Sequence, residues 1–379
     1  MRAPIDIVIV PENKHWGGSE LLWSKSAIAL VEKGITVKIV AYNKLVLPKE
    51  VLQELTVHQI EILRPYHSKV SRWSNFIHRF LPYRLRFHKD DRRLALIESL
   101  KPKLVVVNQG FNFNGVLLMT QLWDKNIPYV SVSHGVSEMY WPPKELRKTM
   151  LAGFKQAKHN FFVSQDNIEV TQLQLGQRLT NLGLVRNPFQ VPYTTPPTFP
   201  EVEGFHLACV GRYDFKTKGQ DVLLRVMMQE KWQTRPLTIH FFGDGDDEDN
   251  LKSIVDNYKL PNIKIHPYTP TVDIWNHMHG LILPSRSEGL PISLVEAMLS
   301  YRVAIVTNVS GSLEVMLPNE TGFVASAPRP VYLDEALENA WQRRMEWEDM
   351  GKKAGAHIRT LVPEFPEQNF ADTLITLLP

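Results

Sequence analysis

The chain of 379 residues contains one cysteine, Cys209. A single thiol excludes an internal disulfide framework and a cysteine-based metal site, which favours a reducing, cytoplasmic location. The sequence also has no run approaching the ~18–20 consecutive apolar residues of a transmembrane helix. The short apolar run after Met1 reaches charge too quickly for a signal peptide, so it predicts a first buried strand.

The formal net charge is only +3, so neither sign of charge is in large excess over the chain. The segment Arg64–Arg93 is an exception. It holds nine basic residues against Asp90 and Asp91, with aromatic and leucine side chains between them. A segment of this kind docks on an anionic membrane surface or binds nucleic acid. The alternative is a solvated helical face whose aromatic side chains pack inward. Composition alone leaves these interpretations open.

Short β-branched runs alternate with helix-like segments along the whole chain. The runs are Asp6–Val10, Thr36–Tyr42, Leu104–Gln109, Tyr129–His134 and Asn160–Ser164, then His206–Gly211, Leu237–Gly243, Ile263–Tyr268, Gly280–Pro284, Val303–Asn308 and Gly322–Ala325. Apolar strands that alternate with amphipathic helices predict parallel sheets covered on both faces. Because the alternation occurs twice, we expect an α/β protein with two doubly wound, Rossmann-like domains.

The segment Asn187–Pro200 marks the boundary between these domains, because it holds five prolines and no helical period. We therefore expect an N-terminal domain over residues 1–190 and a C-terminal domain over residues 201–360. Residues 361–379 follow the break at Pro363 and Pro366. By analogy with related folds, they are expected to form a last helix that returns to the first domain.

Two cations in the second half are placed for an anionic ligand. After the strand that ends at Gly211, a loop carries Arg212 and Lys218, and a helix begins near Gly219. Cations at the carboxyl edge of a parallel sheet suit a diphosphate in the crevice of an open α/β fold. Taken alone, the same two cations are also typical of a solvated surface loop.

The segment Ile282–Ser300 adds a helix start and two carboxylates. An apolar strand leads into a loop with Glu288 and Gly289, and Pro291 opens a helix whose free N–H groups form an anion site. Gly289 lets a ligand approach the backbone closely. Glu288 and Glu296 flank this anion site, where a carboxylate is better suited to ligand hydroxyls than to a phosphate. The structural alternative is a helix-start glutamate together with a buried, paired one.

The acidic run Asp244–Asp249 is similar to a metal-binding D-x-D pattern. These acids follow a strand and precede a helix start, where acidic side chains are favoured electrostatically. Gly243 and Gly245 are suited to a tight turn between the two elements. We therefore expect neither a metal nor another cofactor.

In combination, these motifs resemble the retaining glycosyltransferase family 4 group, or glycosyl transferases group 1, with the GT-B fold. The motifs are Arg212…Lys218-Gly219, Gly243-Asp244-Gly245, and Glu288-x7-Glu296 within P-S-x-x-E-G-x-P-x-x-x-x-E-A-M, in the family's order and approximate spacing. The resemblance is specific over Phe205–Ala325. In the first half it is looser and rests on Gly17-Gly18, His134 and Ser164. Members include bacterial enzymes of capsule, exopolysaccharide and lipopolysaccharide synthesis.

The resemblance implies roles for the four charged residues of the second half. Glu288 would contact the donor sugar and Glu296 the ribose, while Arg212 and Lys218 would bind the diphosphate. The spacing from Arg212 to Lys218 is one residue longer than the commonest family pattern, which leaves Lys216 as an alternative. We favour Lys218 because Gly-Gln-Asp follows it, as in related sequences.

The resemblance also implies a second set of contacts. The backbone around Gly289, Leu290, Pro291 and Ile292 would add N–H donors, and Tyr268 would border the base. Gly17 and Gly18 would lie near the phosphates across the cleft between the two domains. His134 would lie near the transferred sugar, although a histidine after a strand is also often a purely structural residue. With Glu288, Lys218 and Arg212, it completes the expected catalytic set.

We therefore expect a metal-independent, retaining hexosyltransferase of cell-surface polysaccharide synthesis. Its donor would be a nucleotide-sugar, with a UDP-sugar favoured and a GDP-sugar as the alternative, and its acceptor a glycan or a lipid-linked molecule. Retention by front-face attack needs no dedicated nucleophile, and preplaced cations and amide dipoles stabilise the departing diphosphate.

Two other functions are compatible with these motifs, and the basic segment Arg64–Arg93 implies a partner. The chain could instead be a catalytically silent, sugar-nucleotide-binding GT-B partner subunit or a GT-B sugar-nucleotide epimerase. Acceptors in such pathways are often lipid-linked. An anionic membrane surface is therefore favoured as the partner of Arg64–Arg93, which implies a peripheral position on the inner face of the cytoplasmic membrane. Nucleic acid is not expected as a partner.

Overall fold

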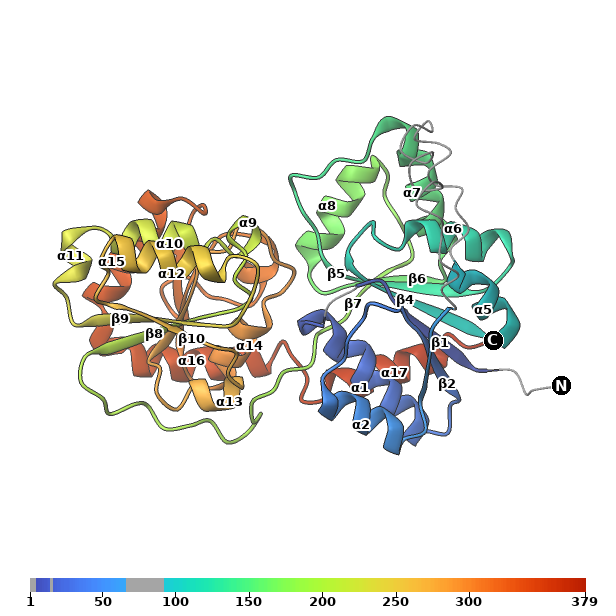
Figure 1. Cartoon of the computed structure of the whole chain (residues 1–379), viewed down its shortest axis with the longest axis horizontal. Helices are drawn as coiled ribbons and strands as arrows, with labels where there is room; N and C mark the ends of the chain where they lie inside the picture. The colour runs from blue at the N-terminus through green and yellow to red at the C-terminus, as the bar shows by residue number, and fades with distance from the viewer. Residues whose placement is uncertain (1–4, 14–15, 66–91) are drawn as a thin grey trace. The chain divides into compact units, whose positions relative to one another are not determined.

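The computed structural model in Figure 1 describes residues 5–13, 16–65 and 92–379. The chain folds into two compact units. The first comprises Met1–Val163, Ile168–Pro188 and Phe365–Pro379, and the second comprises Ser164–Asn167 and Phe189–Glu364. Most of the basic segment Arg64–Arg93 falls outside the described residues.

The first unit is built on a seven-stranded sheet whose order is β3-β2-β1-β4-β5-β6-β7. All of its pairings are parallel. The strands are β1 (Ile7–Pro11), β2 (Val37–Val40), β3 (Glu61–Leu63), β4 (Leu104–Phe111), β5 (Tyr129–Gly135), β6 (His159–Phe162) and β7 (Leu182–Leu184). The central strand β1 is buried along its whole length, as expected for a parallel sheet with helices on both faces.

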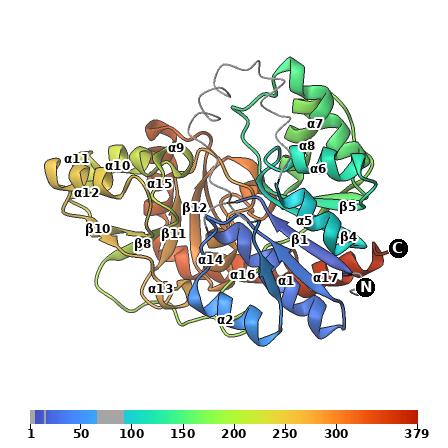
Figure 2. The same ribbon diagram turned by 45° about the vertical axis from the view of Figure 1, so that its right-hand side comes forward.

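Helices cover both faces of this sheet (Figures 1 and 2). One layer consists of α1 (Gly18–Glu32), α2 (Lys49–Val57) and α17 (Pro366–Thr376). The other consists of α5 (Arg92–Leu100), α6 (Val116–Asp124), α7 (Lys144–Gln156) and α8 (Gln165–Leu175).

The C-terminal helix α17 packs against α1 and so belongs to the first unit. Ser26 Oγ donates a hydrogen bond to the carbonyl oxygen of Glu367 at 3.2 Å, and Lys33 pairs with Asp372. The rings of Phe161 and Phe370 meet edge to face at 5.1 Å. The last helix of the sequence therefore completes one face of the first sheet.

The second unit repeats the architecture with a six-stranded parallel sheet of order β10-β9-β8-β11-β12-β13. Its strands are β8 (Phe205–Val210), β9 (Leu237–Phe242), β10 (Ile263–His266), β11 (Gly280–Leu283), β12 (Val303–Thr307) and β13 (Gly322–Ala325). Its α-helices are α9 (Phe215–Lys218), α10 (Gln220–Met227), α11 (Glu230–Gln233), α12 (Glu248–Asn257), α13 (Thr271–Ile274), α14 (Ile292–Leu299), α15 (Pro330–Gln342) and α16 (Trp347–Arg359). Two short 3-10 helices, Ser310–Glu314 and Arg344–Glu346, complete the unit.

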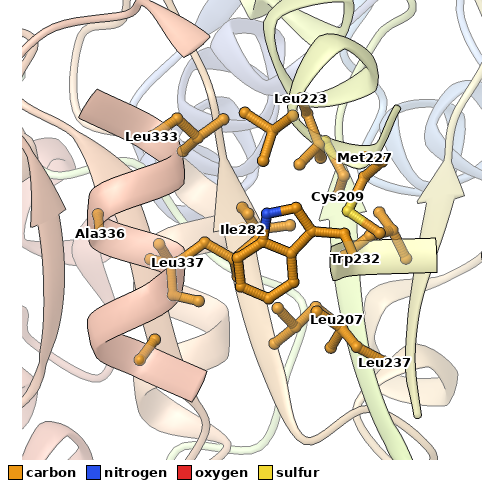
Figure 3. Close-up of a cluster of buried hydrophobic side chains, with 14 of the residues drawn as sticks. Leu207, Cys209, Leu223, Met227, Trp232, Leu237, Ile282, Leu333, Ala336 and Leu337 are labelled. Atoms are coloured by element: carbon orange, nitrogen blue, oxygen red, sulfur yellow. The ribbon is translucent and has the colours of Figure 1, made fainter. Parts of the chain in front are cut away.

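The core of this unit is centred on Trp232, whose indole is fully buried (Figure 3). Its Nε1–H donates to Asp334 Oδ1 at 2.6 Å, so the one polar atom of the ring is satisfied. Cys209 lies in the same cluster, and burial raises the pKa of its thiol to about 12. The thiol therefore packs as a small apolar side chain.

The structure confirms the predicted fold class. Sequence periodicity missed β3 and β7, which lie at the two edges of the first sheet. Each has three residues and is partly exposed, which is too little for an apolar pattern. The proline-rich segment contains no helix or strand between 188 and 200. None of the helices in the described part of the chain is both long and apolar enough to cross a membrane.

Candidate functional site

The strand order of each sheet reverses at one point. In the second unit this point lies between β8 and β11, which are neighbours in the sheet although β9 and β10 separate them in the sequence. Ligands of open α/β sheets bind beyond the carboxyl ends of the strands at such a switch point. Lys218 follows β8 and Glu288 follows β11, so both come from the two segments that flank this position.

The structure brings Lys218 and Glu288 into direct contact. Lys218 Nζ donates to both carboxylate oxygens of Glu288, at 2.8 Å each. Ser285 Oγ donates to Glu288 Oε1 at 2.7 Å. The Glu288 side chain is 7% exposed and that of Lys218 is 26% exposed. Separated by a ligand, this pair offers one cation to an anionic group and one acceptor to a hydroxyl.

Local sequence explains why Lys218 lies there. The carboxylate of Asp214 caps the one-turn helix α9 by accepting the N–H groups of Lys216 and Thr217, and Lys218 is the last residue of that turn. Gly219 then reverses the chain with φ +67°, and a Cβ on it would lie 2.2 Å from the carbonyl oxygen of Pro284. The segment predicted as a loop is therefore a capped helical turn. Lys216 lies on the same turn but is exposed.

Arg212 lies at the start of the same segment. Its carbonyl oxygen accepts a hydrogen bond from Gln220 Nε2 at 2.8 Å, which closes the segment on the first turn of α10. The Arg212 side chain is exposed, whereas the neighbouring Tyr213 is buried. The structure thus holds the Arg212 backbone firmly and leaves the guanidinium on the surface.

The predicted helix start is present at α14. Pro291 is its N-cap, and the N–H of Leu294 already bonds to the Pro291 carbonyl at 3.1 Å. The N–H groups of Ile292 and Ser293, which precede Leu294, have no intrahelical acceptor. The carbonyl of Gly289 accepts the N–H of Gly311 at 2.9 Å, which fixes the approach to the helix. Leu290, between Gly289 and Pro291, is buried.

Glu296 lies on the next turn of α14 and is 3% exposed. Its Oε1 accepts the backbone N–H of Gln190 at 2.7 Å. One oxygen of this carboxylate therefore anchors the proline-rich segment to the second unit. This contact between α14 and the proline-rich segment was not foreseen from the sequence.

In the first unit, the segment after β1 has its own polar cluster. Gly17 and Gly18 are exposed at the start of α1, and Glu20 is buried directly behind them. Glu20 accepts hydrogen bonds from Asn13 Nδ2 at 2.8 Å and Ser19 Oγ at 2.7 Å. Burial raises the pKa of Glu20 to about 7, against the opposing effect of these two hydrogen bonds. The cluster fixes the backbone of the glycine pair.

His134 is buried at the carboxyl end of β5. Its Nε2 bonds to Asn108 Oδ1 at 2.8 Å, and Asn108 Nδ2 donates to the carbonyl of Ser19 at 3.4 Å. Asn108 is therefore the acceptor for an Nε2–H, and the lone pair of Nδ1 is left as an acceptor. Burial lowers the pKa of His134 to about 4, with Asn187 opposing part of the shift, so the imidazole is neutral at pH 7.

The remaining predicted features are Tyr268 and the acidic run Asp244–Asp249. Tyr268 is 66% exposed in the loop after β10. Asp247 is the N-cap residue of α12, and its Oδ2 accepts the N–H of Phe215 at 2.8 Å, so part of the acidic run is structural. In the described residues, no group of three or more histidine, cysteine, aspartate or glutamate side chains is arranged to hold a metal ion.

The two ends of the basic segment are described, and both are engaged within the first unit. Arg64 donates to the carbonyls of Tyr42 and Leu45. Arg93 is 1% exposed and pairs with buried Glu12 at 2.7 Å. Arg93 therefore has a structural role and is not available to a membrane surface, which corrects its inclusion in the docking segment.

A row of histidines crosses the face of the second sheet opposite the Trp232 core. His206 Nδ1 and His240 Nε2 are 2.9 Å apart, and His240 Nδ1 and His266 Nε2 are 3.0 Å apart. Burial, together with the two neighbouring imidazoles, lowers the pKa of His240 to about 3. Burial also lowers the pKa of His279, which accepts the backbone N–H of His206, to about 4. His240 and His279 are therefore neutral at pH 7.

Comparison with known sequences gives matches to part of the chain. The family described as glycosyl transferases group 1 matches residues 199–357. The D-inositol 3-phosphate glycosyltransferase of Paenarthrobacter aurescens is 23% identical over 166 residues, which cover 42% of this chain and 40% of that protein. The D-rhamnosyltransferase WbpZ of Pseudomonas aeruginosa is 26% identical over 126 residues, which cover 32% of this chain and 28% of that protein. The matched segments thus span less than half of either relative.

Comparison with solved structures covers the whole chain. Alr3699/HepE of Anabaena, crystallised in complex with UDP-glucose, has a TM-score of 0.76 and 15% identity, covering 99% of this chain and 100% of that chain. The chain has two doubly wound parallel sheets, and it is similar to this structure over nearly its whole length. It therefore has the GT-B fold. Residues 199–357 match the model of glycosyl transferases group 1, the family that the sequence motifs indicated.

Proposed function

We propose that the chain is a retaining glycosyltransferase that moves a hexose-type sugar from a nucleotide-sugar to a glycan or a lipid-linked acceptor. The observation that carries this proposal is the contact of Lys218 with Glu288 at the switch point of the second sheet. A UDP-sugar is the favoured donor, and the UDP-glucose complex of Alr3699/HepE supports this choice at the level of fold.

In this proposal, donor binding separates the Lys218–Glu288 pair. The diphosphate takes the ammonium of Lys218, and a hydroxyl of the sugar donates to the carboxylate of Glu288. The exposed guanidinium of Arg212 and the first N–H groups of α14 add positive potential around the diphosphate. Both members of the pair thereby exchange one strong interaction for another.

The remaining donor contacts are proposed from the same geometry. Backbone groups from Gly289 to Ile292 bind the phosphates, and the carboxylate of Glu296 accepts the ribose hydroxyls. Tyr268, which is 66% exposed, borders the base. These contacts lie on the segments that follow β10 and β11.

The chemistry that this arrangement supports is departure of a diphosphate. When the anomeric carbon–oxygen bond breaks, both electrons go to the diphosphate and positive charge develops on the sugar ring. Lys218, Arg212 and the α14 N–H groups stabilise the departing charge because they are already oriented before the reaction. We propose that these groups do so without a metal ion.

The acceptor is assigned to the first unit. Gly17 and Gly18, which are exposed at the start of α1, are proposed instead for the phosphates of the donor, as the family resemblance implies. His134, with its neutral imidazole, is proposed to lie near the transferred sugar. An acceptor of cell-surface polysaccharide synthesis, glycan or lipid-linked, fits a cytoplasmic enzyme that works at the membrane surface.

The experiment that tests this function incubates the purified chain with UDP-, GDP- and dTDP-hexoses and follows release of the nucleoside diphosphate. NMR of the released or transferred sugar then reports its anomeric configuration. We expect UDP release with retention. Inversion would contradict the retaining mechanism, while binding without release would favour the silent partner subunit. Formation of an epimerised sugar nucleotide would favour the epimerase.

A further inference from the structure

The two segments that carry Lys218 and Glu288 are fastened to each other beyond the contact of those side chains. The carbonyl oxygen of Thr217 accepts the N–H groups of Arg286 at 2.8 Å and Ser287 at 3.2 Å. These bonds join the α9 turn, which follows β8, to the loop that follows β11. The two backbone segments that flank the candidate site are therefore joined directly to each other.

One side chain adds a second fastening. Arg286 Nη1 and Nη2 donate to Asp221 Oδ1 at 2.6 Å and Asp221 Oδ2 at 2.8 Å, and Nη1 also donates to the carbonyl of Phe215. A planar guanidinium fixes direction as well as distance in such a two-bond pair. Phe215 lies three residues before Lys218, and Asp221 lies three residues after it. Arg286 therefore forms hydrogen bonds to the chain on both sides of the lysine.

We infer that Arg286 is a positioning residue, whose bridge to Asp221 holds Lys218 and Glu288 at the separation that the donor requires. This inference rests on the proposed function. The Arg286 guanidinium bonds to Asp221 and Phe215, while Glu288, two residues further along the same loop, accepts Lys218. Arg286 thus acts on the reaction through the two residues that meet the donor.

The second unit offers a matched control for this bridge. Arg235 Nη1 and Nη2 donate to Glu338 Oε2 at 2.7 Å and Glu338 Oε1 at 3.0 Å. The Arg235 pair is 24% and 26% exposed and the Arg286 pair 32% and 30%, so the two bridges are similarly buried. The Arg235 guanidinium also lies over the Trp232 ring at 4.4 Å, and Glu338 also pairs with Lys231 at 3.3 Å. Arg235 joins the segment before β9 to α15 and does not contact the loops of the candidate site.

The test measures donor turnover and thermal midpoint for Arg286→Ala, Arg286→Lys and Arg235→Ala. A misplacement of about 1 Å at a reacting group costs up to about 10²-fold in rate, so we expect Arg286→Ala to lower kcat by about 10- to 100-fold. Arg286→Lys should recover part of this loss, because it restores the charge without the fork. Arg235→Ala should lower the midpoint at least as much, because it also loses the contact with the Trp232 ring, and should keep wild-type kcat. Equal kcat in the two alanine variants would overturn the inference.

Rescue by exchange of the two charges is a further readout. The double variant Asp221→Arg with Arg286→Asp should recover more kcat than either single reversal, because it restores the pair in the opposite orientation. A purely local fold defect would be worsened by the second substitution. A double variant with lower kcat than both single reversals would therefore count against the inference.

A double-mutant cycle of thermal midpoints tests this inference separately from the proposed function. If Arg286 holds Lys218, Lys218→Ala should lower the midpoint less in the Arg286→Ala background than in the wild type. Coupled neighbours deviate from additivity, and we expect a difference of about 2 °C. Absence of turnover in the wild type would contradict the proposed function alone, and this cycle would still decide the inference. Strictly additive shifts would overturn it.

Discussion

Replacing Lys218 with alanine removes the ammonium that lies 2.8 Å from both oxygens of Glu288. Under the proposed function, the same ammonium stabilises the departing diphosphate. Loss of one preoriented electrostatic donor costs about 10²-fold in kcat, or about 2.7 kcal/mol of transition-state stabilisation. We therefore expect Lys218→Ala to lower the rate of UDP release by about that factor at saturating donor.

The substitution also changes the protein without a ligand. Glu288 stays largely buried and keeps the hydrogen bond from Ser285, so removal of its cation should destabilise the fold by about 1–3 kcal/mol. This loss is small against the stability of a domain, about 5–15 kcal/mol, so the variant should remain folded in the assay. Thermal unfolding measured beside the kinetics checks this point.

Lys216→Ala is the matched control, because Lys216 lies on the same helical turn but is exposed. Initial rates of UDP release are compared for the wild type and both variants. We expect Lys216→Ala to retain the wild-type rate. If Lys218→Ala also retained it, or if both variants lost the same factor, the reasoning from the Lys218–Glu288 contact would be refuted.

Three further predictions concern stability, measured as thermal midpoints by calorimetry. The pKa of His240 is about 3 in the folded state, below its value in the unfolded chain. Protonation of the unfolded chain therefore lowers the free energy of unfolding as the pH falls below about 6.5, by about 2 kcal/mol at about pH 5. The thermal midpoint of His240→Phe should therefore fall less than that of the wild type between these pH values. An equal decrease would contradict this prediction. Gly219→Ala forces a Cβ against the Pro284 carbonyl at φ +67°, so a midpoint and turnover at the wild-type level would be inconsistent with the structure. Glu12→Gln removes the charge that pairs with the buried Arg93 and should lower the free energy of unfolding by about 3 kcal/mol; an unchanged midpoint would show that this pair does not stabilise the fold.

The sequence predicted the strands that are buried on both faces and missed those that are not. Strands such as β1 are continuous apolar runs, and such runs are visible without a structure. The edge strands β3 and β7 take their conformation from pairing with a neighbour, Lys38 with Glu61 and Asn160 with Leu182. Three partly exposed residues carry no periodicity of their own, so their partner has to be known first.

The candidate site was predicted as a set of residues, and its geometry was not. Family motifs indicated Lys218 and Glu288, but their contact depends on β8 lying beside β11 in the sheet. Arg286 gave no signal, because an arginine in a polar loop is indistinguishable from a solvated one until Asp221 is brought to it. Arg93 was grouped with exposed cations for the same reason, and its partner Glu12 lies far away in the sequence.

The central claim is that the Lys218–Glu288 pair at the switch point of the second sheet binds the diphosphate and the sugar of a nucleotide-sugar. The most direct measurement is the thermal midpoint of the wild type and of Lys218→Ala with saturating UDP-, GDP- and dTDP-hexoses. A ligand at about 100 times its Kd stabilises the folded state by about 2.7 kcal/mol. We predict that a UDP-hexose raises the wild-type midpoint by several degrees and that Lys218→Ala loses most of this shift. No shift with any sugar nucleotide, or an undiminished shift in Lys218→Ala, would contradict the claim.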